Sequence, residues 1–116
     1  MAKNIHEFLQ DLKEKLPHDL VTITKPVNPA NFDVSAILKH LEVSGLFPLT
    51  LFEKPLNLKG EISAFPLATN IFATRQRCAL ALGTDPEKWK LDLSLEYAKR
   101  EASPRLPEVI APDFAP

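Results

Sequence analysis

Proline sets the main constraint on this fold. The 116-residue chain has eleven prolines and only three glycines. Proline has no amide hydrogen and a restricted φ, so it ends helices and is confined to the edges or bulges of sheets. Pro17 must stop any helix that precedes it, Pro26 and Pro29 mark a loop, and Pro66 places its strand at an edge or a bulge. The chain is therefore expected to fold from short elements.

The clearest helix is predicted over residues 4–16. Asn4 can cap its first turn with Glu7 as the reciprocal acidic partner, and Lys13 and Lys15 suit the negative end of the helix dipole. The apolar residues lie at helical spacing, which predicts one buried face. They are Ile5, Phe8, Leu9, Leu12 and Leu16.

Further elements follow in the order strand, helix, strand, strand, helix, helix. The second helix should start near Asn31 and end at Gly45, which suits a left-handed cap, and the third should run from Thr74 to Gly83. A fourth is expected to begin at Asp85 and Pro86 and to carry Trp89, Leu93 and Tyr97 on one face. The strands are expected at residues 20–24, 47–52 and 62–70.

This order predicts a small α/β or α+β domain, with a mixed sheet of about three or more strands and about four helices. We expect the domain to occupy residues 1–102. Residues 103–116 contain four prolines and no glycine, which favours an extended tail or linker lying over a partner surface.

Composition excludes several classes of function. A formal net charge of −1 provides no basic field for nucleic acid or an anionic membrane. The single cysteine excludes an internal disulfide framework and any multi-cysteine zinc site. The apolar runs are too short for a transmembrane span, and the first residues lack the apolar core of a signal peptide. We expect a cytoplasmic protein with neither a nucleic-acid nor a membrane partner.

The most suggestive polar cluster surrounds the start of the predicted third helix. Free amides after Thr74, together with the guanidinium groups of Arg75 and Arg77, could bind an anion. An interdomain salt bridge or a solvated turn explains the same residues. We therefore take Asn70, Thr74, Arg75 and Arg77 as a candidate interdomain or anion contact.

Other reactive side chains offer less. Cys78 could be an activated thiol near a helix start, although its apolar surroundings favour a small core residue. His6, His18 and His40 have no metal-ligand spacing and are predicted to lie on the surface. No glycine-rich phosphate loop and no carboxylate pair in an apolar setting is evident, so this segment does not resemble a complete active site.

One segment resembles a known family. Residues 70–83, NIFATRQRCALALG, resemble the "gNlfgsReRiAlaLG" segment that ends the N-terminal domain of UbiD-like decarboxylases. Other pieces agree in order and spacing: FL at 8–9, VTI at 21–23, VNP at 27–29, FDVSAI at 32–37 and LTLFE at 49–53. The prolines of 104–112 resemble the link to the family's next domain.

The resemblance implies a role in reversible decarboxylation of aromatic or α,β-unsaturated acids. The family uses prenylated flavin mononucleotide (FMN) with a divalent metal, usually manganese, and often potassium. Its catalytic and cofactor-binding residues lie in a central domain that would follow Pro116, so no catalytic, cofactor or metal residue is assigned here. The implied partners are the flavin-binding and C-terminal domains, in the same chain or as a separate subunit, in a homo-oligomer.

Two alternatives remain open. A free-standing accessory or adaptor protein could have this fold without the enzyme, in which case Val109, Ile110 and Phe114 should pack on its own core. A small enzyme centred on Cys78 is the other. If the family role holds, the 116 residues alone should neither bind flavin nor decarboxylate.

Overall fold

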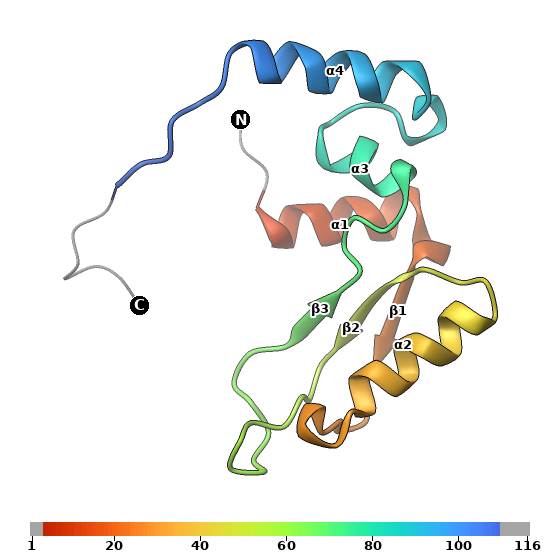
Figure 1. Cartoon of the computed structure of the whole chain (residues 1–116), viewed down its shortest axis with the longest axis vertical. Coiled ribbons are helices and arrows are strands. Elements are labelled where there is room, and N and C mark those ends of the chain that lie inside the picture. The colour runs from red at the N-terminus through yellow and green to blue at the C-terminus, as the bar shows by residue number, and fades with distance from the viewer. Residues whose placement is uncertain (1–3, 110–116) are drawn as a thin grey trace.

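The computed structural model describes residues 4–109 (Figure 1). Over this range the chain forms four α-helices and three strands, with three short 3₁₀ helices, which confirms the predicted α/β fold with a small mixed sheet. The elements are α1 (Ile5–Lys15), η1 (Pro17–Asp19), β1 (Leu20–Ile23), η2 (Pro29–Asn31), α2 (Asp33–Val43), β2 (Leu49–Phe52), β3 (Leu67–Thr69), α3 (Arg75–Ala81), η3 (Pro86–Lys88) and α4 (Leu91–Ala102).

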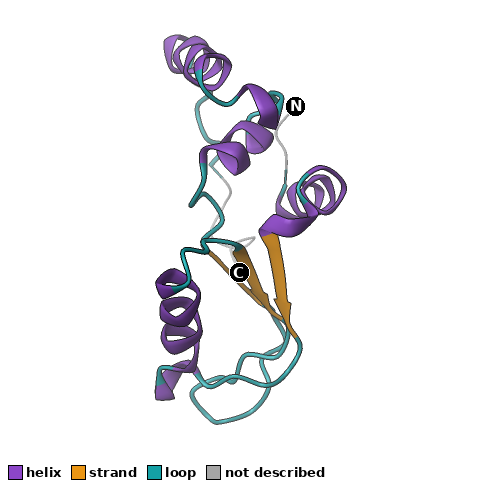
Figure 2. Cartoon of the chain, turned by 90° about the vertical axis from the view of Figure 1, so that its right-hand side faces the viewer, coloured by secondary structure: helices purple, strands orange, loops and turns teal. Residues whose placement is uncertain are grey.

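The sheet has the order β1-β2-β3. Strand β1 runs parallel to β2, with Leu20 opposite Leu49 and Ile23 opposite Phe52, and α2 provides the crossover between them. Strand β3 pairs antiparallel with β2 and forms an edge, as Pro66 predicted. Figure 2 shows α2 on one side of the sheet, with α1 at the sheet's upper end.

The core forms where α1 and α3 meet the upper end of the sheet. Phe8 and Leu12 of α1 pack with Leu49 of β2 and Leu80 of α3, and each of the four is at least 96% buried, since none exposes more than 4% of its surface. The predicted capping box at Asn4 is present and starts α1 in the register that points Phe8 and Leu12 inward.

The start of α2 differs by two residues from the prediction. A 3₁₀ turn capped by the Asn28 side chain precedes the helix, and Asp33 Oδ2 accepts a 2.7 Å hydrogen bond from the Asn28 amide. Between them Phe32 adopts a left-handed conformation with φ of 63°, so the helix begins at Asp33. The predicted left-handed cap at Gly45 is confirmed by its φ of 75°.

The third strand is shorter than predicted. It covers residues 67–69, because its partner β2 ends at Phe52, opposite Leu67, and offers no further ladder positions. Upstream, the Asn57 side chain accepts hydrogen bonds from the amides of Lys59 and Glu61 and closes a turn, leaving Ile62 in an isolated bridge.

The predicted single helix from Pro86 is wrong: it is two elements. The Asp85 side chain caps the turn as expected, accepting a hydrogen bond from the Glu87 amide, but the turn is a 3₁₀ helix, η3, and α4 begins only at Leu91. Arg75 donates hydrogen bonds to the carbonyl oxygens of Trp89 and Lys90, so these two oxygens have a hydrogen-bond partner although the helix is interrupted there.

Beyond Ala102, residues 103–109 form neither helix nor strand and are exposed. The predictions for Ile110 and Phe114 lie outside the described residues. Within residues 4–109, no helix combines the length and the apolar character that crossing a membrane requires.

Candidate functional site

Helix α3 begins where the sequence predicted its cap. The Thr74 hydroxyl accepts a 3.3 Å hydrogen bond from the Arg77 amide, and Thr74 itself is extended. The chain enters this cap from β3 through Asn70, which has a φ of 57°, a conformation that asparagine tolerates better than most residues. All four predicted site residues therefore lie in one short segment.

The Arg77 side chain points into the domain and is 1% exposed. Its Nη1 donates to Asp19 Oδ2 at 3.0 Å, and its Nε donates to the carbonyl oxygen of Ile71 at 3.1 Å. Its Nη2 donates to the carbonyl oxygens of Asn70, at 3.0 Å, and Phe47. These bonds use four of the five guanidinium N–H groups, so Arg77 ties together the segments before β1, before β2 and after β3.

Arg75 faces the opposite way and is exposed. Its Nη2 lies 3.2 Å from Ser94 Oγ and 3.4 Å from the carbonyl oxygens of Trp89 and Lys90, and its guanidinium carbon lies 5.6 Å from the centre of the Trp89 ring. Arg75 thus connects α3 to the start of α4. The two arginines therefore have different contacts: Arg77 is buried and bonds to three segments of the domain, whereas Arg75 is exposed and bonds to the start of α4. An anion or interdomain contact at this helix start stays a prediction.

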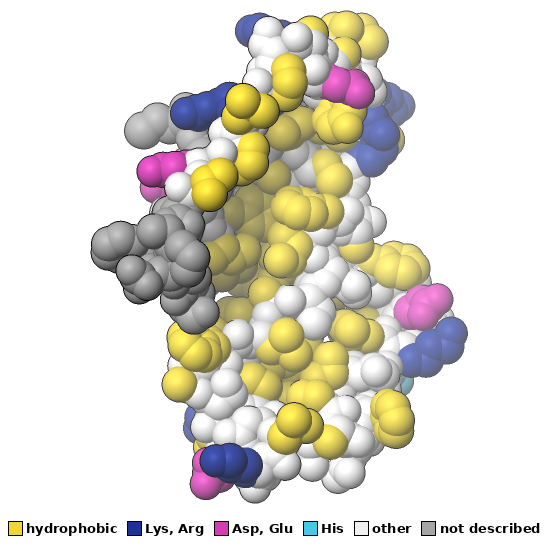
Figure 3. Space-filling model, turned by 60° about the vertical axis from the view of Figure 1, so that its left-hand side comes forward, with side chains coloured by type: hydrophobic (Ala, Val, Ile, Leu, Met, Phe, Trp, Pro, Cys, Tyr) yellow, Lys and Arg dark blue, Asp and Glu magenta, His cyan; other side chains and the backbone are white. Residues whose placement is uncertain are grey.

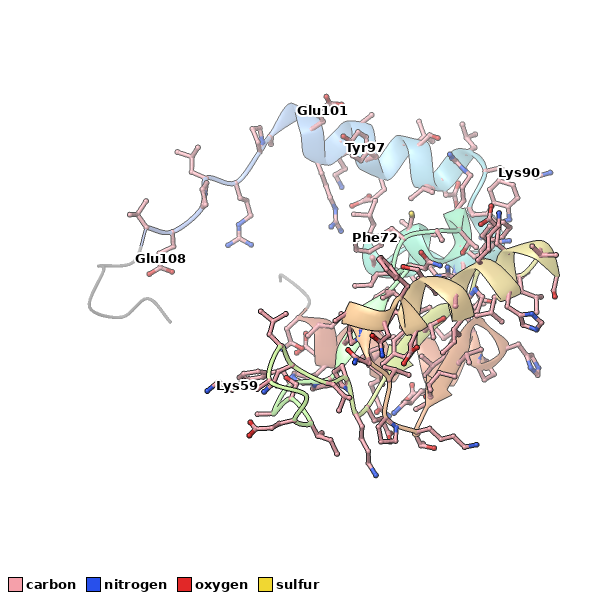
Figure 4. The ribbon with its side chains drawn as sticks, turned by 60° about the horizontal axis from the view of Figure 1, so that its bottom comes forward. Lys59, Phe72, Lys90, Tyr97, Glu101 and Glu108 are labelled. Atoms are coloured by element: carbon pink, nitrogen blue, oxygen red, sulfur yellow. The ribbon has the colours of Figure 1, made fainter. Side chains whose placement is uncertain are left out.

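An open groove of about 570 Å³ lies between α3 and α4. Figure 4 labels two of its lining residues, Phe72 before α3 and Tyr97 on α4, and both are more than half exposed, at 63% and 60%. Figure 3 shows apolar side chains on one face of the molecule, around a hollow between its upper and lower parts. The groove is lined by Phe72, Arg75, Cys78, Ala81, Leu82, Leu93, Ser94 and Tyr97.

Cys78 lines this groove and is half-buried, with its Sγ 3.6 Å from the carbonyl oxygen of Phe72. The surface position predicted for His6, His18 and His40 is confirmed, because all three are exposed. In the part of the chain that the structure describes, no group of three or more histidine, cysteine or acidic side chains could hold a metal ion.

Glu96 on α4 has a shifted titration. A 2.8 Å hydrogen bond from Arg100 Nε lowers the pKa of the Glu96 carboxyl, and the charges of Arg100 and Lys99 act in the same direction against a desolvation effect. The pair lies on the surface, so this lowered pKa marks an ion pair on one helix rather than an acid poised for catalysis.

The family model for the 3-octaprenyl-4-hydroxybenzoate carboxy-lyase N-terminal domain matches residues 10–91. The chain belongs to this family. The UbiD-like resemblance is therefore confirmed, and the matched range contains the whole sheet, α3 and the Arg77 contacts. No solved structure matches the chain.

For this UbiD-like domain, the groove is the feature that sequence reasoning missed. The sequence singled out some of its residues separately: Leu93 and Tyr97 were expected on one helical face, and Phe72 lay within the segment that resembles the family. Nothing in the spacing of the apolar residues indicated that α3 and α4 would be far enough apart to leave these side chains partly exposed to solvent.

Proposed function

We propose that this chain is the N-terminal domain of a UbiD-like reversible decarboxylase acting on aromatic or α,β-unsaturated carboxylic acids. Its role would be structural: it packs on the flavin-binding domain and helps wall the substrate cleft. The family match over residues 10–91 is the observation that carries this proposal. We also propose that residues 1–102 form the domain, that 103–116 link it to the next, and that the enzyme is a cytoplasmic homo-oligomer.

Prenylated FMN, with manganese and potassium, would be bound by the neighbouring domain. The described residues do not fit such a site, because they offer no group of three or more side chains able to hold a metal. The guanidinium of Arg77, the one buried cationic group among the described residues, is already bonded to Asp19 and to three carbonyl oxygens. No catalytic step is therefore assigned to this chain.

The groove between α3 and α4 supports a docking role. Phe72 and Tyr97 keep 63% and 60% of their surface exposed beside an apolar floor that includes Leu93, and Arg75 stands at the rim. Aromatic side chains in a partly open groove with a cationic rim are common anchors at interfaces. Docking the flavin-binding domain here would bury both rings.

The tail bears on the alternative of an adaptor protein. An autonomous protein should pack Val109 against its own core, yet Val109 is 92% exposed and Leu106 is 91% exposed. These two exposed apolar side chains favour a segment that packs on a partner over an autonomous adaptor protein. Limited proteolysis tests this, because rapid loss of the segment after Ser103 would count against an autonomous protein.

Reconstitution tests the proposed function directly. The purified chain alone should show no flavin absorbance and release no CO₂ from aromatic or α,β-unsaturated acids. Mixed with the prenylated-FMN-binding chain of the same source, it should form a stable complex with higher decarboxylase activity. A yellow, active preparation of this chain alone would refute the proposal.

The groove is tested with matched variants. Tyr97→Glu places a charge on the groove and should weaken the complex at least tenfold, whereas Leu58→Glu, at a side chain 99% exposed in a distant loop, should leave it unchanged. Equal effects of the two substitutions would show that the groove is not the docking site.

A further inference from the structure

Helix α4 has apolar side chains on two opposite faces. Leu93 is buried and Tyr97 lines the groove, so one face packs towards α3. On the other face Leu91 and Leu95 are 66% and 59% exposed, and Ala98 and Ala102 are exposed as well. Figures 1 and 2 both show α4 at the upper end of the molecule with α3 below it. Leu95 borders an open hollow that Thr84, Asp85 and Lys88 also line, but more than half of its surface and of that of Leu91 stays exposed.

The outer face has the spacing of a helix-pairing seam. Leu91, Leu95, Ala98 and Ala102 are separated by four, three and four residues, which places them in one stripe along the helix. Leu93 lies two residues from Leu91 and therefore about 160° from it at 3.6 residues per turn. The stripe is thus a second seam, separate from the contact with α3. The family match ends at Leu91, so this surface lies almost entirely outside the matched range.

We propose that this stripe pairs antiparallel with the same stripe of a second copy of the chain. A two-fold axis between Leu95 and Ala98 sets Leu91 against Ala102 of the second copy, and Leu95 against its Ala98. Each large side chain then meets a small one, so the two helices can approach closely and fill the space between them. A parallel pair would instead oppose leucine to leucine and alanine to alanine.

The charges beside the stripe favour the same orientation. Asp92 and Lys99 are seven residues apart and flank the stripe on one side. In an antiparallel pair such flanking positions face each other, so Asp92 of one copy lies beside Lys99 of the other, and symmetry repeats the contact. In a parallel pair Lys99 of one copy would instead lie beside Ser94 of the other, and Asp92 would have no lysine of the second copy beside it. Charge and shape therefore select one arrangement.

The dimer should be weak and concentration-dependent. Twelve residues give a helix of about 18 Å, so the seam is shorter than that of an ordinary stable interface. Sedimentation equilibrium of the 116-residue chain from about 5 to 500 µM covers this weak class of association. We expect the mean mass to rise from monomer towards dimer over this range, and a monomer at every concentration would overturn the proposal.

Substitutions locate the surface. The double variant Leu91→Glu and Leu95→Glu changes exposed side chains and should weaken association at least tenfold, whereas Leu58→Glu should leave it unchanged. Association that persists in the double variant, or that falls equally in the control, would overturn the proposal. Far-UV circular dichroism confirms that each variant retains its helices.

Charge exchange tests the orientation without touching the apolar stripe. Asp92→Lys and Lys99→Asp should each weaken association several-fold, because each brings like charges together. The double exchange should restore it to within about twofold of the wild type. Failure of the double exchange to restore association would refute the antiparallel pairing. Because the dimer depends on α4 alone, it is tested without the flavin-binding domain, and its failure leaves the decarboxylase role intact.

Discussion

Replacing Arg77 by methionine tests whether one side chain holds this domain together. Methionine replaces the apolar stem of arginine but lacks the guanidinium head, so it removes the four hydrogen bonds. Losing one member of a buried ion pair costs about 3–5 kcal/mol. Since Asp19 is 32% exposed and can be rehydrated, we expect the lower end, about 3 kcal/mol. That is a large part of the roughly 5–15 kcal/mol that stabilises a domain.

Urea unfolding followed by far-UV circular dichroism measures this loss. A change of about 3 kcal/mol should lower the midpoint by about 1–3 M for a protein of this size. Arg75→Met is the matched control: the same substitution in the same helix removes exposed contacts of 3.2–3.4 Å and should cost less than about 1 kcal/mol. A loss below about 1 kcal/mol for Arg77→Met would refute the argument, because that is the value of an ordinary surface contact.

Three further predictions concern local features. Asn4→Ala removes the capping box with Glu7 and should lower the free energy of unfolding, measured by thermal unfolding, by about 1 kcal/mol. An unchanged stability would show that α1 does not depend on this cap. Phe32→Gly should raise the free energy of unfolding by about 0.5–1 kcal/mol, because Phe32 is 72% exposed and strained at a φ of 63°. A less stable variant would mean that the Phe32 ring contributes to packing. The lowered pKa of Glu96 means that its contribution to stability is present above its unfolded-state pKa and is lost as the pH falls through the folded-state pKa. Carboxyl NMR titration should show Arg100→Met moving the Glu96 pKa back towards its ordinary value, and an unmoved pKa would exclude Arg100 as the cause.

Local sequence signals predicted most of the elements because their causes are local. Pro17 ends α1, Asn4 and Glu7 cap it, and Thr74 caps α3, each through contacts within a few residues. Where a distant partner set the boundary, the prediction was wrong. Strand β3 begins only at Leu67 because its partner strand ends opposite that residue, and the predicted fourth helix is interrupted where Arg75 contacts the chain before α4.

The candidate site divides in the same way. Its position at the start of α3 was predictable from Thr74 and the two arginines behind it. The separate roles of Arg75 and Arg77 were not, because adjacent helical positions look alike until the surrounding segments are placed. The groove between α3 and α4 likewise depends on how two helices pack, and periodicity describes one helix at a time.

The sequence by itself determined the family, the order of elements and most helix ends, because caps, prolines and apolar spacing act over one or two turns of chain. Only the tertiary structure decided what Arg77 does. Its acceptors include Asp19, 58 residues away, and Phe47, 30 residues away, which reach it only after the sheet and α3 have packed. The tertiary structure also left the outer face of α4 open, since a helix buries only the side that its neighbours cover.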